Sequence, residues 1–244
     1  MDTSNKPIVF LHGFLLDSSG WEVMNTSVFS RPLLFLDLPG HGKNKEIIPE
    51  KEQISAYADW LENEIKQREI THFDLVGHSM GGYIGLEMLQ RTSSGMDKLV
   101  LFHSNYWEDS EERKKNRDRI GAVVRKNVRI FLNESIPLLF HVPEKYPSII
   151  SDIINRAAAM HPDAIVHSAQ SMKNRADHRA LVAMHKDRVY SIQGEFDNLI
   201  SAKESEEDWP GHFEHFFIQK NCGHMSHIEQ PDASAETLIK MLEN

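Results

Sequence analysis

The 244-residue sequence contains a single cysteine, Cys222, so no disulfide bond can form within the chain. A chain without disulfides is typical of a reducing compartment. The sequence also lacks any apolar run near the roughly 20 residues that a membrane-spanning helix requires. A signal peptide has a positively charged segment followed by a long apolar one, and the first residues of this sequence do not show that pattern. We therefore expect a cytoplasmic protein that has no membrane partner.

Positive charge is scarce as well. The 27 Lys and Arg residues are outnumbered by 36 Asp and Glu residues, which gives a formal net charge of -9. Nucleic acids and anionic membranes are bound through basic patches, so this balance argues against both partners. The apolar and charged fractions are ordinary for a globular protein. A small-molecule substrate is therefore the expected partner, and the composition leaves the oligomeric state open.

Six short apolar runs are spread along the chain, and they are continuous rather than alternating. Such runs are typical of strands that are buried on both faces. Segments with apolar residues at helical spacing lie between them, at 55–67, 83–90 and 233–242. Strands that alternate with helices predict an α/β fold with a doubly wound, mostly parallel sheet. The six expected strands are residues 8–11, 33–36, 73–76, 99–102, 189–192 and 215–218.

One connection is much longer than the others. The fourth and fifth expected strands are separated by residues 103–187, whereas a single crossover needs far fewer residues. We interpret residues 104–178, approximately, as a helical cap inserted into a single domain that spans residues 1–244, with 179–185 returning to the core. Its expected helices are 111–126, 135–141, 146–160 and 163–174, and the first is so highly charged that it reads as a solvated face.

The stretch Gly77-His78-Ser79-Met80-Gly81 lies between the third strand and a helix. A serine in a sharp turn between a strand and a helix projects from the edge of the sheet, and small neighbours are needed to permit that turn. Free N–H groups at the start of the helix favour negative charge beside it. Ser79 is therefore the candidate nucleophile.

Two further candidates follow other strands of the predicted sheet. Asp197 comes after the fifth strand and His224 after the sixth, so both belong at the same edge as Ser79. A serine hydroxyl needs a base such as histidine, and a carboxylate on the second ring nitrogen selects the correct tautomer. Backbone N–H groups of Phe14, after the first strand, and Met80 are placed to hold an oxyanion.

These residues resemble the α/β-hydrolase superfamily, and within it the capped serine esterases with a Gly-His-Ser-Met-Gly-Gly nucleophile turn. The resemblance implies that Ser79 is the nucleophile, Asp197 the acid and His224 the base, with the amides of Phe14 and Met80 as the oxyanion hole. It also implies hydrolysis of small to medium carboxylic esters without a cofactor. The motifs that carry it are His12-Gly13-Phe14, Asp37-Leu38-Pro39-Gly40-His41-Gly42, Gly77-His78-Ser79-Met80-Gly81-Gly82, Gly194-Glu195-Phe196-Asp197 and Gly223-His224.

Several alternatives remain open at this point. The same three residues support carbon–carbon bond hydrolysis, thioester cleavage or a lyase reaction, and the scaffold can also serve as a weakly catalytic ligand-binding protein. Glu195, or Glu108 and Asp109 after the fourth strand, compete with Asp197 for the role of the acid. His227 competes with His224, and we expect it to be structural.

The remaining chemistry-bearing residues carry weaker hypotheses. Cys222 precedes His224 by two residues and could form a nucleophilic pair with it. It lacks the sharp strand-to-helix turn that carries Ser79, so we expect a buried thiol. The 14 histidines are scattered without metal-ligand spacing, and we expect no metal. Apolar residues near or within the cap are candidates for the substrate pocket, although each also suits packing of the cap on the core: Tyr106, Trp107, Phe131, Leu138, Leu139, Phe140 and Met172.

Overall fold

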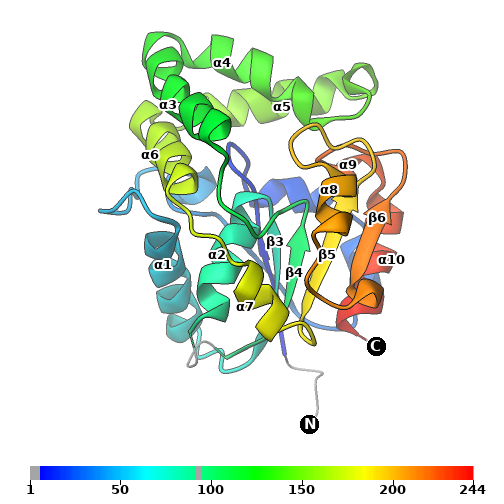
Figure 1. The fold of residues 1–244 in the computed structure, drawn as a ribbon. Coiled ribbons are helices and arrows are strands. Elements are labelled where there is room, and N and C mark those ends of the chain that lie inside the picture. Colours follow the sequence, from blue (N-terminus) through cyan, green and yellow to red (C-terminus); the bar gives the residue numbers. More distant parts are fainter. Residues whose placement is uncertain (1–5, 92–94, 244) are drawn as a thin grey trace.

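The computed structural model describes residues 6–91 and 95–243, and its centre is a six-stranded sheet (Figure 1). The strand order is β2-β1-β3-β4-β5-β6, and all five neighbouring pairs are parallel. This confirms the predicted α/β class, and the expected runs match the observed strands with small shifts at their ends. The strands are β1 (Ile8–Leu11), β2 (Leu33–Leu36), β3 (Phe73–His78), β4 (Met96–Phe102), β5 (Val189–Gly194) and β6 (Phe216–Gln219).

Helices cover both faces of the sheet, as the continuous apolar strands require. Strand β1 shows the division, because its successive side chains point to opposite faces. Val9 and Leu11 join the apolar cluster of α1 (Ile54–Gln67) and α2 (Met80–Leu89). Ile8 and Phe10 join that of the C-terminal helix α10. The other short core helices are α7 (Arg179–Met184), α8 (Ala202–Glu207) and α9 (Ser226–Glu229), and α10 spans Pro231–Leu242.

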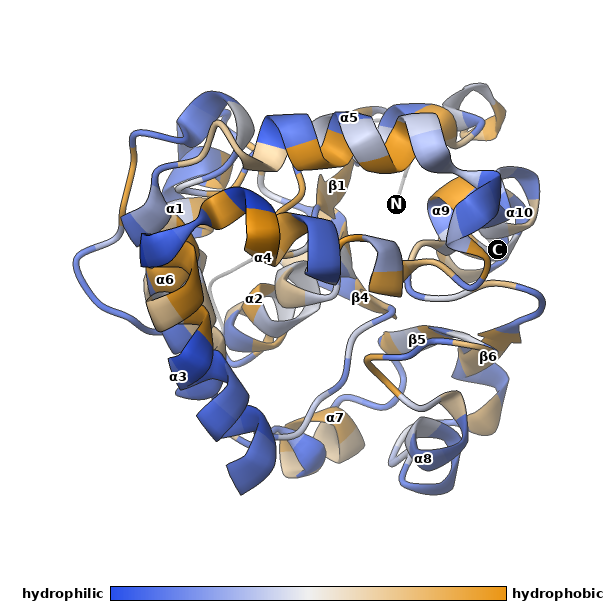
Figure 2. Ribbon diagram, turned by 90° about the horizontal axis from the view of Figure 1, so that it is seen from above, coloured by the Kyte–Doolittle hydropathy of each residue, from blue (hydrophilic) through white to orange (hydrophobic). Residues whose placement is uncertain are grey.

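Four helices form a layer above the sheet, and Figure 1 shows them in green and yellow-green. They are α3 (Glu111–Lys126), α4 (Val128–Ser135), α5 (Pro147–Ala157) and α6 (Pro162–Lys173). In Figure 2, α3 has hydrophilic colours along most of its length, whereas α5 is banded. The layer has an apolar cluster of its own, which includes Leu132 and Ile153 and extends to Leu16 and Met225 of the core.

One part of the cap differs from the expected helices. A helix over 135–141 is wrong, because α4 ends at Ser135 and only a short 3-10 turn, Pro137–Leu139, follows. Pro137 has no N–H, so it cannot donate the hydrogen bond that would continue α4 as an α-helix. The sequence reading missed α4 itself, whose first turn is capped by the side chain of Asn127 accepting from the N–H of Ile130.

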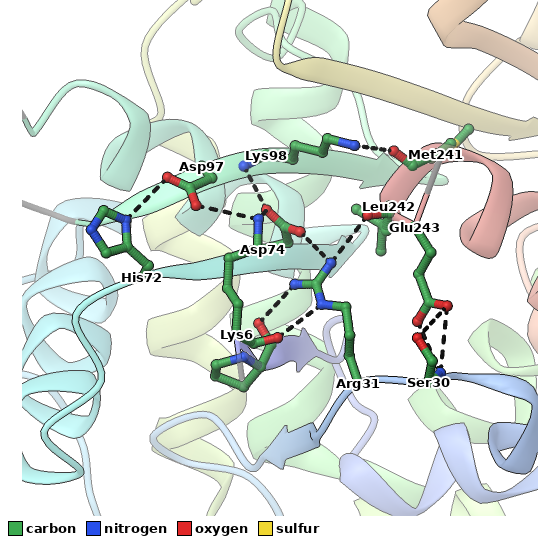
Figure 3. A network of polar contacts seen from close by, with 11 residues as sticks. Lys6, Ser30, Arg31, His72, Asp74, Asp97, Lys98, Met241, Leu242 and Glu243 are labelled. Carbon is green, nitrogen blue, oxygen red and sulfur yellow. Dashed lines mark hydrogen bonds and ion pairs between the residues drawn. The ribbon is translucent and has the colours of Figure 1, made fainter. Parts of the chain in front are cut away.

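A buried ion-pair network lies at the amino end of the strands, opposite the edge that carries Ser79 (Figure 3). Asp74 of β3 is fully buried and pairs with Arg31 at 2.7 Å and Lys6 at 3.0 Å. Arg31 also donates to the carbonyl of Leu242, and Lys98 to that of Met241. Cations at a helix C-terminus complement its dipole, so the network ties α10 to the sheet.

Within the residues that the structure describes, no helix combines the length and the apolar character that crossing a bilayer requires.

Candidate active site

The turn between β3 and α2 places Ser79 in a strained backbone conformation, with φ 51° and ψ -112°. Non-glycine residues rarely adopt a positive φ, and such strain is concentrated at functional sites. The turn closes only because its neighbours lack side chains: a Cβ on Gly77 would overlap the backbone of Gly81. The N–H of Ser79 donates to Phe102 at 3.0 Å, and the Ser104 hydroxyl donates to the Ser79 carbonyl at 2.8 Å.

Asp197 and His224, from the loops after β5 and β6, meet at this edge of the sheet. Nδ1 of His224 lies 2.7 Å from Oδ2 of Asp197, and both side chains are buried. The other carboxylate oxygen accepts from the N–H groups of Leu199 at 2.8 Å and Ile200 at 3.0 Å. Burial alone would raise the pKa of Asp197, but the His224 and His103 imidazoles hold it well below its ordinary value. An ionised Asp197 selects the His224 tautomer with a proton on Nδ1 and a free Nε2.

The loop after β1 packs directly against Ser79. A Cβ built on Gly13 would lie 3.0 Å from Nδ1 of His78 and 3.1 Å from the Cβ of Ser79, so any other residue here would require those side chains to shift. His12 holds the loop, since its Nδ1 donates to the Gly13 carbonyl at 2.8 Å and its Nε2 accepts from Leu38 at 2.9 Å. Met80 is the first residue of α2, so its N–H has no partner within the helix. The backbone of Gly13, the residue before Phe14, thus lies against Ser79, and Met80 follows Ser79 directly.

A cavity of about 350 Å³ opens above these groups, and both Ser79 and His224 line it. Four of the expected pocket residues, Phe131, Leu138, Leu139 and Met172, line this cavity too. The other three expected residues, Tyr106, Trp107 and Phe140, do not line it.

Tyr106 packs edge-on against Trp107 and Trp209, and Phe140 stacks on Tyr146 with ring centroids 5.3 Å apart. Trp107 borders a second, more polar cavity of about 460 Å³. These three residues therefore do not line the cavity beside Ser79, because Tyr106 and Phe140 pack against other aromatic rings and Trp107 borders the second cavity.

The parallel sheet, the turn at Ser79 and the Asp197–His224 pair agree with a match to the "Alpha/beta hydrolase family" over residues 8–237. The chain belongs to this family. The resemblance inferred from the motifs is thereby confirmed at the level of the family, and an enzyme is the general conclusion that it supports.

The hydrolase is similar to proteins with different named activities. It is 26% identical to a 2-succinyl-6-hydroxy-2,4-cyclohexadiene-1-carboxylate synthase of Enterobacter sp. (strain 638), over 96% of this chain and 91% of that protein. A malate-bound thermophilic esterase of Thermogutta terrifontis has a TM-score of 0.88 and 24% identity, over 98% of this chain and 90% of that one. An enol-lactonase of Burkholderia xenovorans LB400 has a TM-score of 0.85 and 18% identity, over 98% and 92%. At these identities the two structures establish the fold alone.

The competing acids are engaged elsewhere in the hydrolase. Glu195 pairs with Lys220 at 3.0 Å and accepts from the N–H of Asn221. Asp109 pairs with Arg175 at 2.8 Å and with Arg117 at 3.1 Å. Glu108, the third rival, pairs with Lys114 at 3.1 Å, so none of the three replaces Asp197 beside the imidazole of His224.

The competing histidine and the cysteine are also buried away from the cavity. His227 packs against Trp21 with ring centroids 4.7 Å apart, and burial lowers its pKa to about 3. Burial raises the pKa of Cys222 to about 12, and its thiol donates to the carbonyl of Gln219. His78 is one of the lining residues of the cavity, and its Nε2 donates to the His224 carbonyl at 2.9 Å.

Helix α3 contributes a polar wall that the sequence reading missed. Arg113, Asn116, Arg117 and Ile120 line the cavity, although the segment was expected to be a solvated face. The signal was present as the spacing i, i+3, i+4, i+7, which places the four side chains on one face of a helix. The other lining residues that were not foreseen are Leu15, Leu16, Tyr83, Ser135, Ile136, Leu199 and Ile200.

This wall carries more positive than negative charge. Asp109 is its buried carboxylate, and the guanidinium groups of Arg175, Arg117 and Arg113 lie 2.8, 3.1 and 3.9 Å from it. Burial would raise the pKa of Asp109, but Arg117 and Arg175 lower it below its ordinary value, so it is ionised. One negative charge thus faces three positive ones, in a protein whose net charge is -9. Arg113 and Arg117 line the cavity, whereas Arg175 is buried and donates to the carbonyls of Trp107 and Met172.

Proposed function

We propose that this enzyme is a serine hydrolase that cleaves small to medium carboxylic esters through an acyl-enzyme intermediate. The observation that carries the proposal is the 2.7 Å contact between Asp197 and His224, with His224 and Ser79 on the wall of one cavity. A hydroxyl, an imidazole and a carboxylate in this order form the relay that activates serine nucleophiles.

In the first half of the reaction, Nε2 of His224 takes the proton of Ser79 as Oγ bonds to the ester carbonyl carbon. The carbonyl electron pair moves to the oxygen, and the N–H groups of Phe14 and Met80 stabilise that oxyanion. The intermediate then collapses, the bond to the leaving oxygen breaks, and His224 returns its proton to the departing alcohol. Asp197 stabilises the imidazolium while it exists.

In the second half, His224 takes a proton from water, whose oxygen bonds to the acyl carbon. The second oxyanion collapses, the acid leaves, and Ser79 recovers its proton from His224. Each proton transfer uses the same imidazole nitrogen, so the scheme calls on no metal or organic cofactor.

The cavity supports a substrate of modest size. Its volume of about 350 Å³ is at the small end of ligand pockets. Phe14, Leu139 and Met172 offer apolar contacts to an acyl chain, and Ile120 and Phe131 of the cap line the same space. We therefore expect short and medium acyl chains to be preferred to long ones.

The test is hydrolysis of a series of p-nitrophenyl esters by the wild type and by Ser79→Ala. The substitution should lower kcat by about 10⁶, since the nucleophile is removed. Ser27→Ala, at an exposed serine far from the site in the sequence, is the matched control and should behave as the wild type. Near-normal turnover by purified Ser79→Ala would overturn the mechanism.

A second candidate is a reaction on a substrate that carries a carboxylate, including a lyase reaction on the same three residues. The arginine-rich wall of α3 favours it, because guanidinium groups bind carboxylates through paired hydrogen bonds. The synthase relative points in the same direction, since its name describes a carboxylate. Arg117 is the principal residue, as its Nε is held by Asp109 at 3.1 Å while its side chain lines the cavity.

Matched neutral and anionic substrates distinguish the two candidates. If the wall binds a carboxylate, kcat/KM for a dicarboxylic acid monoester should exceed that for the corresponding diester. Arg117→Gln should then lower the monoester value by about tenfold or more and leave the diester value unchanged. Arg119→Gln, at an exposed arginine of the same helix, is the control. Equal loss on both substrates would remove the anionic candidate.

A further inference from the structure

His103 is the first residue after β4, the strand between those that lead to Ser79 and Asp197. It is fully buried, and its backbone has a positive φ of 46°. Non-glycine residues rarely adopt a positive φ, so the surrounding structure must compensate the strain at His103. Its N–H donates to the Ile192 carbonyl at 2.8 Å, so the residue is held at the carboxyl end of β5 as well. The ester mechanism above makes no use of this imidazole.

The ring of His103 bridges two groups. Its Nδ1 lies 3.4 Å from Oδ2 of Asp197, the oxygen that His224 contacts at 2.7 Å. Its Nε2 lies 2.6 Å from Oγ of Ser226, and that hydroxyl lies 3.1 Å from the hydroxyl of Ser234. In the described part of the chain Nδ1 has no hydrogen bond of good geometry, so the carboxylate is the partner within reach.

We propose that His103 is a positioning residue of this site, which holds Oδ2 of Asp197 together with His224 and is itself oriented by Ser226. The inference rests on the proposed function, in which Asp197 orients the base.

The charge of Asp197 decides the tautomer of His103. A carboxylate repels the lone pair of an unprotonated nitrogen, so Nδ1 carries the proton and points it at Oδ2. Nε2 is then an acceptor, and the Ser226 hydroxyl donates to it. Burial lowers the pKa of His103 although Asp197 opposes the shift, so the ring is neutral.

As a result, both oxygens of the Asp197 carboxylate have polar partners. Oδ1 accepts from two backbone N–H groups, and Oδ2 is shared by two imidazoles. The Nδ1–H of His103 also partly neutralises the negative charge of Asp197 that acts on His224. Removing it should make the imidazolium of His224 more favourable, and the acidic limb of kcat/KM against pH should move to higher pH.

The other titratable groups that face this pair stay in place when His103 is changed. His78 and His227 pack against it, and both are buried imidazoles whose pKa is lowered first by burial and then by neighbouring histidines. The Cys222 thiol faces Asp197 and has its pKa raised to about 12. These groups are uncharged near neutrality, so a change in the pH profile reports on His103.

Two variants separate positioning from packing. His103→Phe keeps a ring but has no donor, whereas the amide of His103→Asn reaches the place of Nδ1 and asparagine tolerates a positive φ. We expect His103→Phe to lower kcat by about 10–100-fold with KM unchanged, since His103 does not line the cavity. Its acidic limb should rise by about half a pH unit or more. His103→Asn should recover most of the rate and the wild-type limb.

The rate at which a fluorophosphonate probe labels Ser79 gives the same readouts without ester turnover. If the wild type neither hydrolyses esters nor is labelled at Ser79, the proposed function is wrong. If the wild type is labelled and His103→Phe has the same pH profile as the wild type, the role of His103 is wrong but the proposed function stands.

The tautomer itself is tested by nitrogen NMR of the histidine rings, which needs no catalysis and no variant at position 103. A proton on Nδ1 of His103 in the wild type is expected, and a proton on Nε2 alone would overturn the proposal. His103, Asp197 and His224 also present ligand atoms within 4.8 Å of one another. Loss of activity on chelation with recovery on added Zn²⁺ would replace the positioning role by a metal site.

Discussion

Loss of the Asp74 charge should destabilise the protein strongly without affecting the site. Figure 3 shows the carboxylate between Arg31 and Lys6. The side chain of Asp74 is 0% exposed and that of Arg31 is 4% exposed, so Asp74→Asn would leave a guanidinium buried beside carbonyl oxygens alone. The volume of the side chain is nearly unchanged, so the effect reflects the lost charge together with one lost acceptor, since Oδ1 accepts from Lys98 and Lys6 and Oδ2 from Arg31.

The magnitude follows from this burial. Removal of one partner from a buried ion pair costs about 3–5 kcal/mol, because the other charge remains without compensation. In a protein of this size each 1 kcal/mol lowers Tm by about 2–4 °C, so a fall of about 6–20 °C is expected. Asp97 is the matched control, since it contacts Lys6 at 3.2 Å but is 42% exposed. Asp97→Asn should cost only about 0–1 kcal/mol.

Thermal unfolding followed by circular dichroism measures both variants, and urea unfolding supplies the free energies. The kcat/KM of folded Asp74→Asn should equal that of the wild type, because the network lies at the amino end of the strands. A cost below about 1 kcal/mol, which is the value of an exposed pair, would refute the reasoning. So would equal costs for Asp74→Asn and Asp97→Asn.

Two further predictions concern buried titratable groups. Burial lowers the pKa of His41 and His227 to about 3, so below about pH 6.5 the unfolded chain binds protons that the native state does not. The free energy of unfolding should therefore fall from pH 6.5 toward pH 3, and urea midpoints that are constant between pH 7 and pH 5 would contradict this. Cys222 is 0% exposed with a pKa raised to about 12, so a thiol reagent at pH 8 should leave the native protein unmodified and react once in urea, and rapid native labelling would show that the thiol is accessible.

Local chemistry was sufficient to predict the parallel core and the turn that carries Ser79. Apolar runs mark buried strands wherever they occur, and the glycines around Ser79 are demanded by overlaps within the turn itself. The placement of Asp197 and His224 at one edge follows from the common direction of parallel strands. The helices above the sheet were harder to predict, since Asn127 and Pro137 bound α4, a helix of only eight residues, and each acts on the few residues beside it.

The sequence by itself determined which side chains share a face, but only the tertiary structure decided what that face meets. The spacing of Arg113, Asn116, Arg117 and Ile120 puts them together on α3 whether they turn to water or to the cavity. His103 likewise appears as one polar residue after a strand, and its distance from Asp197 exists only once β4 lies beside β5. Periodicity is set by bonds along the chain, whereas partners are set by packing between segments that are far apart in it.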